Sequence, residues 1–280
     1  MRKINFDFLF FINTHTHKMS DIIWHQLPKD LSKLICGYVG TDRIKPWIKK
    51  IIVPIDYHWL SMNPEAMYLI QSNLDKINWE CLSRNPSAID LLKANSNKID
   101  WEYLSENPSA MDLLKANPDK INWEYLSINP SAIHLLEANP DKIDWWELSG
   151  NPSAMDLLKA NPDKINWNKL SKNPSAMDLL KANPNKIDWD NLSKNSSAMD
   201  LLLANLDKIN WYCLSQNSSA LNLIESNPDK INWYCLSQNP SAIDLLKANK
   251  YKINTQTIWA NPAIFEPKAN HFTLLMQVKF

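Results

Sequence analysis

The strongest constraint on this chain is a sequence period of 22 residues. One copy runs from Asn107 to Trp123 and reads NPSAMDLLKANPDKINW. The same tryptophan position recurs in Trp79, Trp101, Trp123, Trp145, Trp167, Trp189, Trp211 and Trp233. Tyr57 and Thr255 stand at that position in two weaker flanking copies, so ten copies cover about residues 55–266. A fixed period between 20 and 50 residues predicts a stack of identical supersecondary units.

Each copy carries signals for two helices. Asn107 is a good N-cap, and Pro108 suits the first position of a helix. Apolar residues then follow at helical spacing, in Ala110, Met111, Leu113 and Leu114. Asn117-Pro118 ends this helix, and Asn122 caps a second one that starts at Trp123. We expect a helix of about ten residues followed by one of about six.

One such unit cannot bury its own apolar residues, so neighbouring units must stack. The sequence therefore predicts an all-α protein, an α-solenoid of about ten helix-turn-helix repeats with a short helical N-terminal cap. At about 10 Å per packed helix, ten units would form a curved rod about 90–100 Å long. The expected divisions are a disordered or spurious extension in 1–18, a helical cap or F-box-like segment in 19–53, the solenoid in 54–266 and a C-terminal cap or tail in 267–280.

Composition argues against several classes of protein. The 30 basic and 30 acidic residues cancel, whereas nucleic-acid binders usually carry a basic excess. The three glycines form no phosphate-binding loop, and the four cysteines form no C-x-x-C pair for zinc. We expect free thiols and no cofactor. No run of about 20 apolar residues predicts a transmembrane helix.

The histidines form no catalytic pattern with a nucleophile. His15 and His17 lie in the N-terminal extension, and His134 stands where most copies have aspartate. Because nucleophile and base must be held in contact, scattered residues do not predict catalysis. We expect no enzymatic activity.

Two columns of the repeat are nearly constant. The asparagine before the first helix occurs in all ten copies, from Asn63 to Asn261, and is interpreted as a ladder of helix caps. The lysine before the isoleucine, such as Lys120 and Lys142, suggests either an anion-binding stripe or a side chain whose aliphatic stem covers tryptophan. The preceding acid, as in Asp119-Lys120, favours the second interpretation.

Three columns vary, namely the first, second and fifth residues after the tryptophan position. Variation on a fixed scaffold is how solenoids carry recognition surfaces, and Tyr, Trp and Arg favour binding hot spots. Drift at an exposed face is the alternative. The candidate partner-binding residues are Glu80, Arg84, Glu102, Tyr103, Glu106, Glu124, Tyr125, Trp146, Glu147, Lys169, Lys172, Lys194, Tyr212 and Tyr234.

The segment before the repeats has helical spacing of its own. The run Leu27-Pro28-Lys29-Asp30-Leu31, followed by Leu34-Ile35, resembles the opening of an F-box. That family docks onto the adaptor subunit of a cullin-type ubiquitin ligase. The resemblance implies that Leu27, Pro28, Leu31, Leu34 and Ile35 contact this adaptor. A pair of helices that caps the first repeat explains the same pattern.

The repeats themselves resemble a known group. Asn-Pro, Leu-Leu, Asn-Pro, Lys-Ile and Trp fall in register as in the tandem 22-residue repeats of giant nucleocytoplasmic large DNA viruses. This resemblance implies a viral protein acting inside an infected cell, in the host cytoplasm or viral factory, or in the virion. It implies no activity for particular residues.

The expected function is a protein–protein interaction scaffold. In one version it is a viral adaptor that recruits targets to host machinery, with a ubiquitin-ligase adaptor as one partner. The alternative is a structural component of the virus particle or viral factory. Binding of nucleic acid or membrane is not expected.

The tryptophan column gives a first test. Trp145→Ala should destabilise the fold by about 3–5 kcal/mol, because it removes a large apolar side chain from between units. Lys142→Ala should cost much less. Thermal melting of both variants checks this, and equal melting temperatures would show that the tryptophans are not part of the core.

Overall fold

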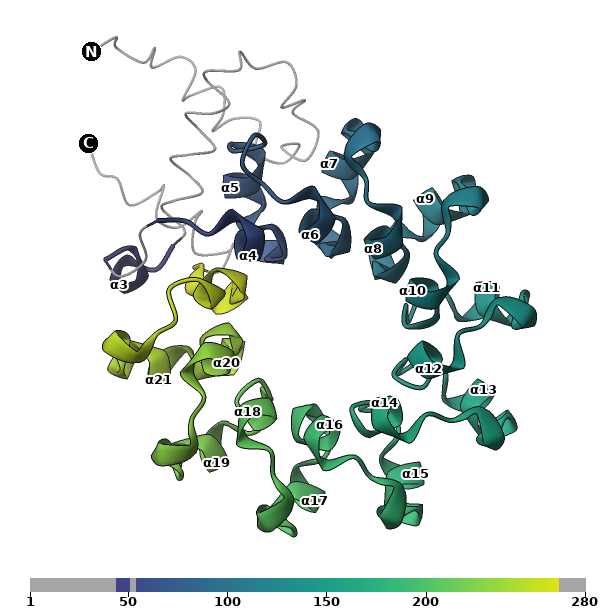
Figure 1. Ribbon diagram of the computed structural model, residues 1–280. Coiled ribbons are helices and arrows are strands. Elements are labelled where there is room, and N and C mark those ends of the chain that lie inside the picture. The colour runs from purple at the N-terminus through teal and green to yellow at the C-terminus, as the bar shows by residue number, and fades with distance from the viewer. Residues whose placement is uncertain (1–43, 51–53, 267–280) are drawn as a thin grey trace, which may run out of the picture.

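The computed structural model describes residues 44–50 and 54–266, and in these ranges the regular secondary structure is helical. Short helices alternate between an inner and an outer circle around a common axis (Figure 1). Each inner helix begins at the tryptophan position. The inner helices are α4 (Tyr57–Ser61), α6 (Trp79–Arg84), α8 (Trp101–Glu106), α10 (Trp123–Ser127), α12 (Trp145–Leu148), α14 (Trp167–Ser171), α16 (Trp189–Lys194), α18 (Trp211–Leu214), α20 (Trp233–Gln238) and the 3₁₀ helix η15 (Thr257–Ala260).

The outer circle carries the other α-helix of each unit. These are α5 (Met67–Gln71), α7 (Ile89–Ala94), α9 (Met111–Ala116), α11 (Ile133–Glu137), α13 (Met155–Ala160), α15 (Met177–Ala182), α17 (Met199–Leu203), α19 (Leu221–Glu225) and α21 (Ile243–Ala248). The expected ten-residue helix is in fact broken, because a tight turn precedes the α-helix at Ala110, with φ −92° and ψ 2°. In five units this turn is a 3₁₀ helix: η3 (Pro64–Ala66), η4 (Pro86–Ala88), η6 (Pro108–Ala110), η13 (Pro240–Ala242) and η16 (Pro262–Ile264).

A second 3₁₀ helix, absent from the sequence-based expectation, follows most outer helices. These are η5 (Ser96–Lys98), η7 (Pro118–Lys120), η8 (Pro140–Lys142), η9 (Pro162–Lys164), η10 (Pro184–Lys186), η11 (Leu206–Lys208), η12 (Pro228–Lys230) and η14 (Lys250–Lys252). The predicted caps are confirmed. The side chain of Asn107 accepts a hydrogen bond from Ser109 N, and that of Asn122 accepts one from Tyr125 N.

The core consists of the same few residues in every unit. Ala110, Leu114 and Leu126 are completely buried, and their equivalents recur around the ring. Trp123 is only half-buried and packs against this core. The lysine column covers the tryptophans: Lys142 Nζ lies 4.5 Å from the ring centroid of Trp123, at the start of the inner helix that precedes it in the chain. The interpretation of these lysines as tryptophan covers is therefore supported, with the cation itself over the ring.

A ladder of buried asparagines joins each unit to the one before it. Asn129 Nδ2 donates to Ser105 O at 2.9 Å and to Asn107 O at 3.0 Å, while its Oδ1 accepts from Ser131 N. Asn129 is fully buried, so this column is part of the core and more than a set of caps along an edge. Serines form a parallel ladder, because Ser105 Oγ donates to Trp101 O and accepts from Asn122 N of the next unit.

The ladder continues across the two ends of the repeat array. Asn63 Nδ2 donates to Trp259 O at 2.8 Å and to Asn261 O at 3.1 Å, which repeats the contacts of Asn129 in the middle of the array. Figure 1 shows α4 beside the last unit, with the chain closed into a ring. The expectation of an open rod is therefore wrong. The residues around Trp259 and Phe265, which belong to the last and weakest of the ten copies, complete the ring as its tenth unit.

A short leader segment reinforces this junction. Ile44 pairs with Phe265 in an antiparallel bridge, and Lys45 N donates to Ile264 O at 2.9 Å. Helix α3 (Pro46–Lys49) follows, with Ile48 fully buried. The segments 1–18 and 267–280 and the F-box-like residues Leu27, Pro28, Leu31, Leu34 and Ile35 lie outside the described residues, so those interpretations stay predictions.

The asparagine ladder gives a stability prediction. Asn129→Ala leaves Ser105 O and Ser131 N without their hydrogen-bond partner and removes one of the two bonds to Asn107 O, which still accepts from Ala110 N, so it should cost about 2–4 kcal/mol. Asn117→Ala is the matched control, since Asn117 Nδ2 makes one half-buried bond, to Leu113 O, and its loss should cost about 1 kcal/mol. Urea unfolding measures both. A loss for Asn129→Ala no greater than for the control would contradict a structural ladder.

Ring closure predicts a short distance between the first and ninth units. Spin labels at Gln71 in α5 and Lys247 in α21, both exposed, should lie about 20–30 Å apart, because a single unit separates their own two units. An open solenoid would hold them about 80 Å apart. Pulsed dipolar spectroscopy on a cysteine-free background distinguishes the two, and a long distance would exclude the ring.

Candidate functional site: the lumenal face of the ring

The three variable columns lie on the inner helices or on the residue that ends each of them. We call this inner surface the lumenal face and name its columns first, second and fifth, by position after the tryptophan. All 14 candidate residues therefore belong to the inner circle of helices around the ring axis (Figure 1). The sequence predicted their common face, but the closed ring places it on the inside.

The second and fifth columns connect neighbouring units. The Arg84 guanidinium stacks 3.8 Å from the centroid of the Tyr103 ring, and Arg84 Nε lies 3.5 Å from Glu106 Oε2. The rings of Tyr103 and Tyr125 meet edge to face with centroids 5.5 Å apart. Arg84 therefore pairs with residues of the next unit. This matching argues against random drift in these columns.

The same matching recurs on the other side of the lumen. Lys169 Nζ forms an ion pair with Glu147, its counterpart in the preceding unit. Gln216 Nε2 contacts Cys235 Sγ at 3.6 Å. Each pair joins residues of adjacent inner helices. Much of the second and fifth columns is therefore engaged within the ring.

The first column is different because its side chains are exposed. Three of them are large aromatics: Trp146 is 52% exposed, Tyr212 is 49% exposed and Tyr234 is 41% exposed. Glu80, Glu102, Glu124 and Asp190 of the same column are also exposed. Exposed tryptophan and tyrosine are the residue types most enriched at binding hot spots.

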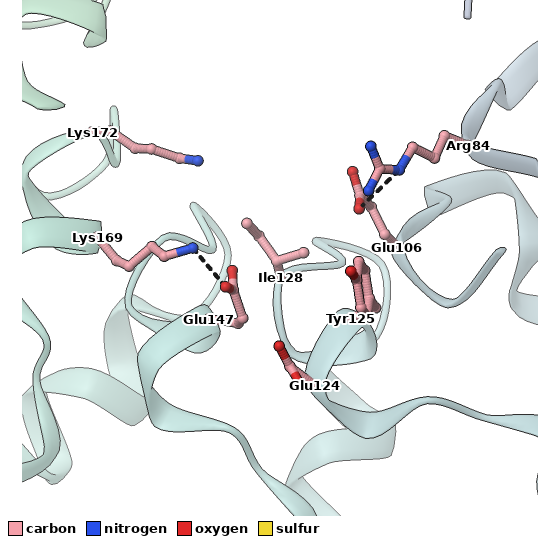
Figure 2. Close-up of a pocket in the computed structure, with 8 residues that line it drawn as sticks. All are labelled: Arg84, Glu106, Glu124, Tyr125, Ile128, Glu147, Lys169 and Lys172. Atoms are coloured by element: carbon pink, nitrogen blue, oxygen red, sulfur yellow. Dashed lines mark hydrogen bonds and ion pairs between the residues drawn. The ribbon is translucent and has the colours of Figure 1, made fainter. Parts of the chain in front are cut away.

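A hollow of about 240 Å³ opens on the lumenal face between α6 and α14, lined by Arg84, Glu106, Glu124, Tyr125, Ile128, Glu147, Lys169 and Lys172. All but Ile128 belong to the candidate set. Figure 2 shows Lys172 reaching into the hollow from one side and Arg84 from the other, with Ile128 between them. Gly150 stands in the fifth column beside Ile128 and adds no side chain there; a Cβ on it would lie 3.4 Å from Glu147 O and 3.6 Å from Ile128 Cδ1.

The surroundings shift several pKa values. Partial desolvation lowers the pKa of Lys172, and the like charge of Lys169 adds to the effect. A hydrogen bond to Glu102 raises the pKa of Tyr125 to about 12, and one to Glu80 raises that of Tyr103. Each tyrosine thus contacts a first-column acid of the preceding unit.

The thiols in the described part of the chain are free and buried, at Cys81, Cys213 and Cys235. Burial raises the pKa of all three thiols, so none is an activated nucleophile. Cys81 Sγ lies 3.5 Å from His58 Nδ1 near the ring junction. Cys36 lies outside the described residues.

The described ranges, residues 44–50 and 54–266, contain no candidate metal site and no candidate membrane-spanning helix. No group of three or more histidine, cysteine or acidic side chains is arranged there to hold a metal ion. None of the helices in these ranges is long and apolar enough to cross a membrane.

Sequence reasoning missed the pairing between units. A usable signal was present, since Glu147 and Lys169 have opposite charges and are 22 residues apart, and so do Arg84 and Glu106. The hollow had no such signal, because it depends on the curvature that brings α6 and α14 to the same side.

Comparison with known protein families, curated proteins and solved structures gives no match to this chain. The resemblance to giant-virus repeats therefore stays an expectation from the sequence, and function must be argued from the ring itself.

The Tyr125 contact predicts a titration. Because its pKa is raised from 10 to about 12, the Glu102 contact favours the neutral phenol. This contribution to stability is present below pH 10 and is lost as the pH rises through 12. In ultraviolet difference titration, Tyr125→Phe should remove a phenolate that forms near pH 12. If Tyr125→Phe instead removed a phenolate absorbance step near pH 10, the hydrogen bond between Tyr125 and Glu102 would be contradicted. Circular dichroism should confirm that the fold persists.

Proposed function

We propose that this protein is a non-enzymatic interaction scaffold that binds a segment of a partner protein on its lumenal face. The observation that carries the proposal is the exposure of Trp146, Tyr212 and Tyr234, which belong to helices α12, α18 and α20 of the inner circle (Figure 1). Trp146 contacts Lys169, Tyr212 contacts Cys235 and Tyr234 contacts Trp59, yet these contacts within the ring leave about half of each aromatic side chain exposed.

The contrast between columns supports this proposal. The side chains of Arg84 and Lys169 are 37% and 24% exposed and pair with acids of the ring, whereas Trp146, Tyr212 and Tyr234 are 41–52% exposed. Fixed inner helices hold the exposed side chains in place, so little ordering entropy is lost on binding.

The viral adaptor is the more specific version of this proposal. In it, the F-box-like segment 19–53 engages a ubiquitin ligase and the ring holds the target. A structural role in a particle or viral factory is the alternative. An extended spacer would need free solenoid ends for end-to-end growth, and here the units at the two ends contact each other.

Site-specific photocrosslinking tests the proposal in cells that express the full chain. A benzophenone amino acid replaces Trp146 in the lumen or Tyr251, which is 82% exposed and lies in η14 of the outer part of the ring. We expect a protein adduct from position 146 that Tyr212→Ser and Tyr234→Ser together abolish, because both remove aromatic contacts.

The matched control changes outer residues of similar exposure, Leu203→Ser and Leu206→Ser, which are 53% and 51% exposed. The adduct should survive this change. No adduct at position 146, or one equally sensitive to the outer changes, would overturn the proposal. Identification of the adduct as a capsid or factory protein would favour the structural alternative.

A further inference from the structure

Charge is distributed unevenly along the axis of the ring. None of the ten first-column residues is lysine or arginine, and four are acidic: Glu80, Glu102, Glu124 and Asp190. The fifth column instead holds Arg84, Lys172 and Lys194, against a single acid at Glu106. The first column starts each inner helix and the fifth ends it, so equivalent positions occupy the same end of the lumen in every unit. One rim is therefore acidic and the other more basic.

Helix dipoles account for part of this pattern, since acids favour helix N-termini and bases favour C-termini. Helix dipoles do not account for the exposed Trp146, Tyr212 and Tyr234 in the same column, because these neutral side chains carry no charge that a helix N-terminus would stabilise. Aromatic faces and carboxylates together are the groups that attract lysine and arginine side chains.

The first-column carboxylates are available for such a ligand. Among the described residues, none of the four forms an ion pair with a lysine or arginine of the ring. Asp190 accepts a hydrogen bond from the neutral amide of Asn210, and Glu102 accepts one from the Tyr125 phenol. Neutral partners leave the negative charge of both uncompensated.

The lumen has room for a peptide. Ten inner helices about 8–10 Å apart place their axes on a circle about 25–32 Å across. Subtracting a helix diameter of about 10–12 Å leaves about 15–20 Å, which exceeds the width of an extended chain or of one α-helix.

We propose that the acidic, aromatic rim formed by the first column binds a Lys/Arg-rich segment of a partner protein. This inference rests on the proposed function and assigns the chemistry of the partner. The carboxylates pair with basic side chains, while Trp146, Tyr212 and Tyr234 receive their aliphatic stems and cationic heads.

Fluorescence anisotropy with the full chain and two labelled 12-residue peptides tests the proposal. One peptide alternates lysine or arginine with serine, and the other alternates glutamate with serine. At about 0.15 M salt we expect the basic peptide to bind and the acidic peptide not to bind. Glu80→Gln, Glu102→Gln and Glu124→Gln combined should weaken binding about tenfold, and Trp146→Ser should weaken it as well.

A matched control removes three exposed acids from outer helices, through Asp90→Asn, Asp112→Asn and Asp156→Asn. It changes the net charge equally and should leave binding unchanged. Equal weakening by both triple variants would reduce the effect to bulk charge and overturn the inference, as would preference for the acidic peptide.

The two proposals fail separately. If position 146 crosslinks a protein but the basic peptide does not bind, the charge assignment is wrong and the lumenal scaffold remains. If position 146 crosslinks nothing, the lumenal scaffold itself fails, and any binding of the basic peptide to the isolated ring does not rescue it.

Discussion

The buried asparagine amide is the interaction on which the ring depends. Helices of four to six residues leave most of their terminal N–H and C=O groups without partners inside the helix, so each unit is unstable alone. One side chain in each unit solves this problem for two units at once. Asn151, for example, caps its own turn through Oδ1 and satisfies two carbonyls of the preceding unit through Nδ2, at Ser127 and Asn129. A shorter or purely apolar side chain would leave Ser127 O and Ser153 N without this partner, while Asn129 O would keep only its bond from Ala132 N.

Much of this arrangement could be predicted from the sequence. Period, caps, the two-helix unit and the apolar columns follow from residue types and spacing, and the structure confirms them. Closure could not be predicted, because it depends on a rotation of about 36° per unit, the tenth part of a circle, and no single residue encodes that angle. The weak last copy was misleading for a physical reason. Thr257 and Trp259 depart from the consensus where the last unit fits between its two neighbours: Thr257 Oγ1 donates to Tyr234 O of the ninth unit, and Trp259 is buried with its carbonyl accepting from Asn63 of the first unit.

The candidate surface could be predicted only in part, because the contacts between neighbouring units cannot be read from the sequence. Variation pointed to the right three columns, but the sequence could not separate side chains that contact the next unit from those that remain free. Glu147 and Glu124 are both variable-column acids that line the hollow, yet among the described residues Glu147 forms an ion pair with Lys169 and Glu124 forms none with a lysine or arginine. Whether such an acid is paired within the ring or remains free depends on the residue that the next unit places beside it. The pairs also make the order of units specific, because exchanging two units would separate Arg84 from Tyr103 or Glu147 from Lys169.

Closure has a consequence for how such a gene can change. In an open array, duplication or loss of a single repeat by recombination lengthens or shortens the protein and leaves its remaining interfaces intact. Here the same event changes the angle demanded of every interface and removes the contact between Asn63 and Asn261. Selection for a folded product would therefore hold the copy number at ten while the lumenal columns diversify. Open repeat arrays change by gaining or losing repeats, whereas this ring would change by amino-acid substitutions within a fixed number of repeats.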